Sequence, residues 1–564
     1  MKGYEIIIES LKKENVDTIF GYPGGAIMAI DDVLMDCNEI HYVLARHEQG
    51  ATHEADGYAR ATGKVGVVLV TSGPGATNTI TGIATAYADS VPLVVFTGQV
   101  PTTLIGNDAF QEADTVGISR PCTKHNFLVK STSELAKTIK EAFYIARTGK
   151  PGPVLVDLPK DVILGEAEFI YPKKVQLVGY NPTVKGNPRQ IEKVVDVLLK
   201  SGKPLLYVGG GAISSDASKQ ITKLANRLQI PVFVTLMGQG AFDPESELFL
   251  GMAGMHGTYS SNMAIQNCDF LFSLGARFDD RITGKLDEFA PLAKIAHIDV
   301  DPVSVGKNVP TEYPLVGDLG TVLDQLLENV EKKAKPVDFY KTKHKEWLKM
   351  IEKWKQEHRL DYQRSTDVIK PQQAIDCLSD LLAGKDPIVA VGVGQHQMWS
   401  SQFMKLSKPR SFLTSGGLGT MGYGLPAAIG AQVAYRDRIV VDIDGDGSFQ
   451  MNIQELATIV QENLKLKMMI INNEYLGMVR QWQNLFFNNR YAHTDMTFQP
   501  DFVKVAQAYG IKAGRVSSPD ELEGAVKTMI EYDGAYLLDV VVDRLENVYP
   551  MVPAGAPLDR MILV

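Results

Sequence analysis

Two short polar segments in the last third of the chain contain the types of residue that bind metal ions and phosphate. Asp446 lies between Gly445 and Gly447, directly after the apolar run RIVVDI, and Asn473 closes the next apolar run, KMMIINN. Ligands of open parallel sheets collect at the carboxyl ends of strands, so we expect the two side chains at neighbouring strand ends. Carboxylate and amide oxygens suit Mg²⁺, and glycine lets backbone amides approach phosphate oxygens closely. The pair therefore predicts one site for magnesium and a phosphate-bearing ligand.

The elements that must position this site alternate along most of the chain. Short runs rich in Val and Ile, such as VGVVLV, PVLVDLP, DFLFSLGA and RIVVDIDGDG, are separated by Ala-rich helical patterns. This alternation predicts doubly wound α/β domains, in which helices cover both faces of parallel sheets. A chain of 564 residues is too long for one hydrophobic core, so we expect three domains.

Polar segments indicate where the domains meet. Residues 165–190 are polar and rich in Pro and Gly, which is typical of a linker. Residues 330–365 are rich in Lys and Glu but keep an apolar stripe, which favours a solvated helix on a domain surface over a nucleic-acid-binding helix. TSGPGATN and TSGGLGTM begin similar segments in the first and last thirds, so we expect two domains of one topology around a Rossmann-like middle domain. We place the domains at 1–170, 188–335 and 365–564.

Composition excludes several classes of protein. With 45% hydrophobic and 22% charged residues the chain is typical of a soluble globular protein, and a net charge of -9 argues against nucleic-acid binding. No apolar run approaches the roughly 20 residues of a membrane helix. Four scattered cysteines show no metal-ligand spacing and indicate reduced thiols. We therefore expect a cytoplasmic protein without membrane or nucleic-acid partners.

The Gly-Asp-Gly and Asn-Asn groups, with 24 residues between them, resemble the cofactor motif of the thiamin-diphosphate-dependent enzyme superfamily. The resemblance implies that Asp446, Asn473 and the backbone carbonyl of Tyr475 hold Mg²⁺, and that Ser448 and the flanking glycines contact the diphosphate. Taken alone, Asp446 is better explained by an Asx turn and Asn473 by a helix cap. The pair at this spacing is far more specific.

Glu48 resembles the glutamate that activates the cofactor in this superfamily. The stretch YVLARHEQGATHEADGYAR places Glu48 just past a strand and at the start of a helix. The resemblance implies that Glu48 hydrogen-bonds the aminopyrimidine ring and assists proton transfer. Glu54 is the nearest rival and fits less well, and a first-turn Glu that favours the helix dipole is the structural alternative. The resemblance implies three further cofactor contacts: Gln395, His396 and Met421, the last of which has a core methionine as its alternative.

Seven motifs in order resemble the acetohydroxyacid synthase (acetolactate synthase) family: GYPGGAI, RHEQGATHEADGYARATG, FQEADTVGISR, PGPVLVDLPKD, GARFDDR, NNEYLGMVRQWQ and PMVPAG. The resemblance implies that pyruvate is decarboxylated on thiamin diphosphate and condensed with pyruvate or 2-ketobutyrate, in valine, leucine and isoleucine biosynthesis. It also implies a homodimer or a dimer of dimers, in which the first domain of one chain meets the third domain of another so that Glu48 and Asp446 serve one cofactor. A separate small regulatory subunit is implied as well. A flavin-using pyruvate oxidase or another 2-keto-acid carboligase or decarboxylase remains the alternative within the superfamily. A non-catalytic nucleotide-binding or regulatory protein is the alternative outside it.

The same family resemblance assigns roles around the substrates. Gln111 and the Gly25 backbone are placed near the reacting carbon, with Phe110 and Lys160 at the entry. Arg281 would hold the acceptor carboxylate, and Trp482 would sense the acceptor's alkyl group. The alternatives are a core Phe110, a surface ion pair at Arg281 and an ordinary core or interface tryptophan at Trp482.

The middle domain carries a bare Gly triplet, GGG, which alone is a weak dinucleotide signal. Several of its segments resemble the flavin-contacting segments of the family. The resemblance implies a structural, non-redox FAD held by Gly210, Thr235, Met237, His256, Gly257, Arg277 and Asp299.

Overall fold

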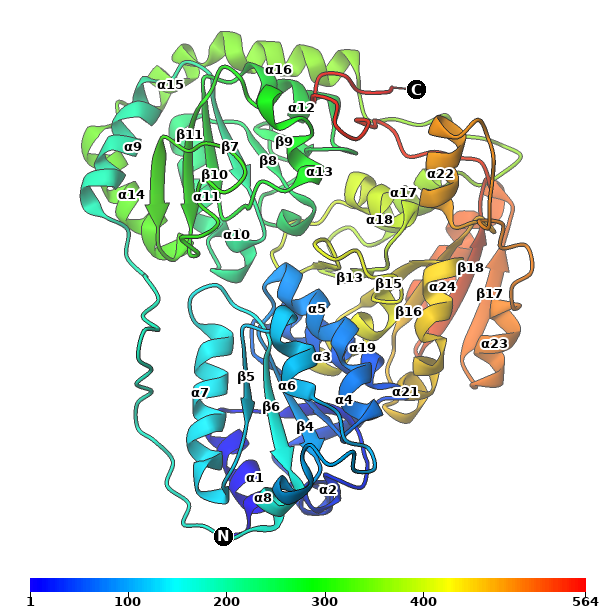
Figure 1. The fold of residues 1–564 in the computed structure, drawn as a ribbon. Helices are drawn as coiled ribbons and strands as arrows, with labels where there is room; N and C mark the ends of the chain where they lie inside the picture. The colour runs from blue at the N-terminus through cyan, green and yellow to red at the C-terminus, as the bar shows by residue number, and fades with distance from the viewer. Residues whose placement is uncertain (564) are drawn as a thin grey trace.

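The computed structural model describes residues 1–563, and the chain folds around three six-stranded sheets (Figure 1). The first sheet has the order β2 (His41–Leu44), β1 (Thr18–Tyr22), β3 (Gly66–Val70), β4 (Leu93–Gln99), β6 (Val154–Pro159) and β5 (His125–Leu128). The third has the order β14 (Phe412–Thr414), β13 (Ile388–Val391), β15 (Val440–Gly445), β16 (Lys467–Asn472), β18 (Tyr536–Val541) and β17 (Lys512–Val516). Both sheets follow the same chain order, so the predicted common topology of the first and third domains is confirmed.

The middle sheet has a different order. Its strands are β12 (Tyr313–Val316), β11 (Lys294–Asp299), β10 (Phe270–Leu274), β7 (Pro204–Val208), β8 (Val232–Val234) and β9 (Phe249–Met252). If the six strands are numbered in chain order, the sheet reads 3-2-1-4-5-6 from the β9 edge, which is the order of the Rossmann fold. Its switch point lies between β7 and β10. The predicted fold class, with two alike domains around a Rossmann-like one, is confirmed.

Helices cover both faces of each sheet (Figure 1). The first domain contains α1 (Gly3–Lys13), α2 (Met28–Met35), α3 (Glu48–Thr62), α4 (Pro74–Asn78), α5 (Ile80–Asp89), α6 (Thr115–Ser119), α7 (Leu135–Arg147) and α8 (Lys160–Leu164). The middle domain contains α9 (Pro188–Lys200), α10 (Gly211–Ser214), α11 (Ser218–Leu228), α12 (Tyr259–Asn267), α13 (Asp280–Thr283) and α14 (Leu319–Lys333), followed by α15 (Val337–Lys343) and α16 (Lys345–Glu357). The third domain contains α17 (Pro371–Leu381), α18 (Gln395–Phe403), α19 (Gly424–Ala434), α20 (Asp446–Phe449), α21 (Leu456–Gln461), α22 (Gly477–Phe486), α23 (Phe502–Ala508) and α24 (Leu522–Glu531).

Local sequence explains many of these boundaries. The central strands β4, β6, β15 and β16 are buried along their whole length, as expected for near-continuous apolar runs covered on both faces. Asn187 caps α9 by accepting hydrogen bonds from the backbone of Arg189 and Gln190, and Pro188 occupies the first helical position. Helix α3 ends at Gly63, whose φ of 76° favours glycine.

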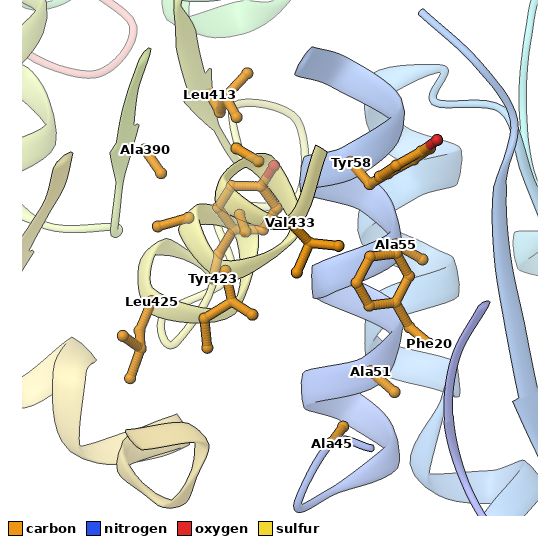
Figure 2. Close-up of a cluster of buried hydrophobic side chains, with 14 of the residues drawn as sticks. Phe20, Ala45, Ala51, Ala55, Tyr58, Ala390, Leu413, Tyr423, Leu425 and Val433 are labelled. Atoms are coloured by element: carbon orange, nitrogen blue, oxygen red, sulfur yellow. The ribbon is translucent and has the colours of Figure 1, made fainter. Parts of the chain in front are cut away.

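The first and third domains share one hydrophobic core. Figure 2 shows Ala51, Ala55 and Tyr58 of α3 beside Tyr423 and Val433 from the α19 region. The two helices approach closely at glycines, since a Cβ at Gly430 would lie 1.8 Å from the backbone oxygen of Glu54. The first and third domains are therefore packed as one unit, although the whole middle domain lies between them in the sequence.

The two polar segments have the structures expected of them. Residues 166–187 form no helix or strand and connect the first domain to the middle one (Figure 1). Trp347 and Ile351 of α16 are only 2% and 3% exposed and pack against the middle domain, with the charged side of the helix outward. The limits of the three domains stay a prediction. No helix within residues 1–563 has the length and apolar character needed to cross a membrane.

Candidate active site

Asp446 and Asn473 lie at the ends of neighbouring strands. β15 and β16 are parallel, with Gly445 opposite Ile471, so Asp446 and Asn473 both follow the carboxyl edge of the third sheet. Both side chains are buried, with exposed fractions of 1% and 5%. The Asp446 Oδ2 atom has no hydrogen-bond partner within the described chain.

The turn after β16 orients the second ligand. Asn473 Oδ1 accepts a hydrogen bond from the backbone N–H of Tyr475 at 3.1 Å, which is an Asx turn. Glu474, between them, has a φ of 54°, a left-handed conformation that is uncommon for a residue with a side chain. Asn473 thus forms an Asx turn rather than the helix cap that was its alternative, and it also lies beside Asp446.

A cavity of about 60 Å³ surrounds these side chains. Nine residues predicted from the sequence as cofactor or metal contacts line it: Gln395, His396, Met421, Gly445, Asp446, Gly447, Ser448, Asn473 and Tyr475. The structure adds eight lining residues: Val393, Gly394, Trp399, Ile471, Leu476, Gly477, Met478 and Val479.

The chemistry of this cavity fits a cation and a phosphate. Burial raises the pKa of Asp446 to about 7, and the carboxylates of Asp539 and Glu474 add to the rise; a divalent cation would compensate that cost. The buried His396 Nε2 makes no hydrogen bond within the described chain, and the nearby carboxylate oxygen Asp444 Oδ1 is 3.4 Å away. A Cβ at Gly445 would lie 2.8 Å from His396 Nδ1, so glycine is required for this approach. Gln395 was expected to contact the cofactor. Its side-chain amide instead forms hydrogen bonds within the protein, to Gln481, Glu546 and Asn473.

Glu48 lies at the N-terminus of α3, at the carboxyl edge of the first sheet. Its side chain is 9% exposed, and its Oε2 accepts a hydrogen bond from Asn78 Nδ2 at 2.9 Å. Asn78 lies 30 residues away at the end of α4, and no local pattern singled it out. Helix α3 is capped by His47, whose Nδ1 accepts a hydrogen bond from Gln49 N. These contacts hold Glu48 in one place at the first helical turn.

The predicted substrate residues of the first domain lie on the same side as Glu48. Gln111 has a φ of 58°, and it lies against Gly73, where a Cβ would be 2.8 Å from the Gln111 backbone oxygen. Non-glycine residues with positive φ often occur at functional sites. Gly25 is exposed and has open space where a Cβ would be.

One chain does not bring all predicted residues together. Within residues 1–563, five predicted residues of the first domain line neither this cavity nor the larger cavity between the three domains: Gly25, Glu48, Phe110, Gln111 and Lys160. Phe110 is 88% exposed, which excludes the core alternative, and Lys160 is exposed at the start of α8. The first domain and the third therefore each present a part of the predicted site.

A larger cavity of about 560 Å³ lies where the three domains meet. Six of the seven predicted flavin residues line it: Gly210, Thr235, Met237, His256, Arg277 and Asp299. Gly257 follows His256 but is not part of the lining. Asp299 closes β11, which pairs with β10, one of the two strands at the switch point of the middle sheet, where ligands of Rossmann folds bind. Asp89 and Lys150 of the first domain and Met478 of the third complete the walls.

Arg281 and Trp482 also line the larger cavity. Arg281 is largely exposed, and its nearest carboxylate, Asp280, is 3.6 Å away. Trp482 is half-buried, with its ring 5.3 Å from that of Phe486. Burial lowers the pKa of His256 to about 4, so the imidazole is neutral at pH 7, and its Nδ1 lies 3.2 Å from the Pro550 oxygen.

Comparisons with known proteins cover the three domains in order. Residues 1–118 match the N-terminal TPP binding domain of thiamine pyrophosphate enzymes, residues 191–326 match the central domain, and residues 392–540 match the C-terminal TPP binding domain. The acetolactate synthase large subunit of Haemophilus influenzae is 46% identical, over 100% of this chain and 98% of that protein. The acetolactate synthase isozyme 3 large subunit of Escherichia coli is 47% identical, over 100% and 98%. The probable acetolactate synthase large subunit of Methanocaldococcus jannaschii is 48% identical, over 100% and 95%.

The chain belongs to the acetolactate synthase large subunit family. It is a thiamin diphosphate enzyme, since its first and last domains match TPP binding domains. In this acetolactate synthase family member, the residues at the two strand ends and the glycine-lined cavity belong to the C-terminal TPP binding domain, and Glu48 belongs to the N-terminal one.

Proposed function

We propose that this chain is the catalytic subunit of an acetolactate synthase, which converts two pyruvate molecules to 2-acetolactate, or pyruvate and 2-ketobutyrate to 2-aceto-2-hydroxybutyrate. One observation supports this most strongly: a chain similar over its full length to acetolactate synthase large subunits buries Asp446 and Asn473 side by side in a glycine-lined cavity. When bound, thiamin diphosphate supplies the carbon on which one 2-keto acid loses CO₂ and is joined to a second.

Asp446, Asn473 and the carbonyl of Tyr475 would hold Mg²⁺ in this proposal. The Asp446 carboxylate has a buried oxygen without a partner, which is the ligand type that Mg²⁺ prefers. Gly445, Gly447 and Ser448 would contact the diphosphate, since backbone amides near glycines bind phosphate oxygens. Met421 would contact the cofactor from the same cavity.

Glu48 would exchange the proton that the cofactor's aminopyrimidine ring requires. Asn78 holds the Glu48 Oε2 atom, which leaves Oε1 for the ligand. The backbone of Gly25 and the side chain of Gln111 would lie near the reacting carbon, with Phe110 and Lys160 at the entry.

The complete site would form between two chains. Glu48 and Asp446 belong to parts of one chain that do not share a cavity, so we infer a homodimer in which the first domain of one copy meets the third domain of the other. Exposed apolar side chains next to both parts support such a contact, with Phe110 88% exposed, Met451 53% and Val479 51%. The relatives are described as large subunits, and we expect a separate small regulatory subunit here as well.

The larger cavity would hold FAD in a structural role, because the proposed reaction has no net redox step. Its lining combines the Rossmann switch point with side chains from all three domains. Arg281 would hold the acceptor's carboxylate, because a planar cation binds carboxylates in two places. Trp482 would contact the acceptor's alkyl group.

The test is an assay for acetolactate from pyruvate with thiamin diphosphate, Mg²⁺ and FAD, run alongside an oxygen electrode. The proposal expects acetolactate without oxygen consumption, and acetohydroxybutyrate when 2-ketobutyrate is added. Oxygen consumption that matches pyruvate loss would instead support the flavin-dependent pyruvate oxidase alternative. Absence of both products would contradict the proposed function.

A further inference from the structure

Helix α22 forms a wall of both cavities. Met478 lines the smaller and the larger cavity, Gly477 and Val479 line the smaller one, and Trp482 lines the larger one. A displacement of this helix would therefore change the shape of both cavities at once.

Two buried side chains of α22 bond the C-terminal part of the chain: Arg480, which donates to the Glu546 oxygen at 2.5 Å, and Gln481. The exposed fraction of Gln481 is 0%. Its Oε1 accepts hydrogen bonds from Gln395 Nε2 at 2.9 Å and from the backbone N–H of Val548 at 2.8 Å. Its Nε2 donates to the backbone oxygen of Val548 at 3.1 Å. Since a buried amide that loses a partner is costly, this arrangement joins the helix tightly to the C-terminal segment, residues 546–552.

The partners of Gln481 lead to both ligand sites. On one side, Gln395 Oε1 accepts a hydrogen bond from Asn473 Nδ2 at 3.2 Å, and Asn473 is the proposed metal ligand. On the other side, the C-terminal segment reaches the larger cavity at Pro550, whose oxygen is 3.2 Å from His256 Nδ1.

Two further contacts join that segment to the larger cavity. Gln402 Nε2 donates to the backbone oxygens of both His256 and Tyr549, at 2.9 and 3.1 Å. Val552 N donates to the oxygen of Met255, which lines the cavity. The hydrogen-bonded path between the sites is thus continuous on both sides of Gln481, apart from the two covalent steps from Val548 to Pro550.

We propose that Gln481 is a positioning residue that couples the binding of a flavin dinucleotide in the larger cavity to the binding of magnesium and a diphosphate in the smaller one. The inference rests on the proposed function, which assigns these ligands to the cavities. A ligand that orders His256 orders the C-terminal segment, and Gln481 transmits that order to Gln395 and Asn473. Such coupling is reciprocal, so each ligand should tighten the other.

The test compares binding, without any measurement of turnover. The dissociation constant of thiamin diphosphate at saturating Mg²⁺ is measured with and without FAD, by quenching of intrinsic fluorescence, in the wild-type protein and in Gln481→Leu, Gln481→Glu and Gln483→Leu. Gln483 is a matched control, because it is a glutamine of the same helix that bonds Ala492 O and Thr494 Oγ1 and lines neither cavity.

We expect FAD to tighten thiamin diphosphate binding at least about fivefold in the wild type and in the Gln483 variant. The factor should fall to about one in Gln481→Leu, and to an intermediate value in Gln481→Glu, which keeps the acceptor but loses the donor to Val548. Melting temperatures of the cofactor-free proteins establish that each variant folds. If the leucine variant does not fold, the glutamate variant decides.

A merely structural role predicts a different pattern. Lower melting temperatures with an unchanged coupling factor in the Gln481 variants would overturn the inference, as would independent binding of the two cofactors to the wild type. Failure of the wild type to bind either cofactor would overturn the proposed function first, and the coupling with it.

Discussion

At the scale of single residues, Glu48 owes its orientation to a few contacts from different elements. Glu48 is the first residue of α3 and lies shortly after a strand. Its carboxylate accepts one hydrogen bond, from Asn78 at the end of α4. A side chain held in this way loses little freedom when a ligand binds, which favours proton transfer at a defined atom.

Replacement of Glu48 by glutamine tests this role. An amide cannot exchange the proton, so we expect Glu48→Gln to lower kcat by about 10²- to 10⁴-fold while the fold remains intact. The measurement is acetolactate formation together with thermal melting and thiamin diphosphate binding. Glu531→Gln, at a position 60% exposed, is the control and should behave as wild type. Normal turnover of Glu48→Gln would remove Glu48 from the mechanism.

Trp482 carries the second residue-scale prediction. An extra methylene in an apolar pocket is worth about 1–3 kcal/mol, so a large apolar surface is needed to favour 2-ketobutyrate over pyruvate. We expect Trp482→Leu to lower the ratio of acetohydroxybutyrate to acetolactate by up to about tenfold in a competition assay. Phe487→Leu, at an exposed position just beyond the helix, serves as the control. Equal loss of both products would assign Trp482 a structural role instead.

At the scale of elements, the crossing of α3 and α19 holds the first and third domains together. Gly57 and Gly430 lie at the contact, and a Cβ at either would lie only 2.1 or 1.8 Å from a backbone oxygen of the other helix, far closer than non-bonded atoms can approach. The helices pack at this distance only because both residues are glycine.

We expect Gly430→Ala to destabilise the protein by about 1–3 kcal/mol or more, because the added methyl group must push the helices apart. Gly524→Ala is the matched control, since it is a glycine in helix α24 with open space where the methyl would lie. That control should stabilise the protein by roughly 0.5–1 kcal/mol through helix propensity. Urea unfolding of both variants is the measurement, and similar effects of the two would contradict the close crossing.

A buried carboxyl pair at the same crossing predicts a pH dependence. Burial, followed by the neighbouring Glu455 carboxylate, raises the pKa of Glu54 well above its ordinary value of 4.5. Glu462 adds to this rise, and Arg46 opposes it. Glu455 itself accepts hydrogen bonds from the Arg46 backbone and from Thr458 Oγ1. Glu54 thus keeps its proton in the folded state at pH values where the unfolded chain has lost it.

Because the folded-state pKa of Glu54 is raised, its contribution to stability is fully present below pH 4.5 and is lost as the pH rises toward the folded-state pKa. Glu54→Gln removes this titration and keeps a donor toward Glu455. We expect the variant to gain melting temperature relative to wild type at pH 8 and to lose that advantage at pH 4.5 or below, at one scan rate. A difference that does not change with pH would contradict a Glu54 carboxyl that stays protonated in the folded state.

At the scale of the whole molecule, the proposed dimer requires that two chains complete one site. Glu48→Gln and Asp446→Ala disable different parts, so each variant alone should be inactive. A hybrid dimer would hold one site with both changes and one with neither. We expect co-refolded mixtures to recover up to about a quarter of the wild-type activity, since half of the dimers are hybrids with one intact site each. No recovery despite subunit exchange, followed by differently tagged chains, would contradict the shared site.

The sequence by itself determined the kind of fold and nine of the residues that line the smaller cavity. Apolar runs and glycine-containing turns predict where strands and helices lie and end, because these local structures depend on residues that are close in the sequence. Asp446 and Asn473 follow consecutive strands, and consecutive strands of parallel sheets are often neighbours. The repeat of TSG segments likewise indicated two domains of one topology. The roles of the site residues stay a prediction.

Only the tertiary structure decided how distant parts meet. The core shared by the first and third domains, the hydrogen bond from Asn78 to Glu48, and the amide of Gln481 between Gln395 and Val548 join residues without local patterns that pair them. The separation of Glu48 from the Asp446 cavity within one chain agrees with what the family resemblance implied, but no local pattern of the sequence shows it. The physical reason is that such contacts depend on how whole helices pack and on where each buried amide finds partners, and many sequences with the same local pattern would pack differently.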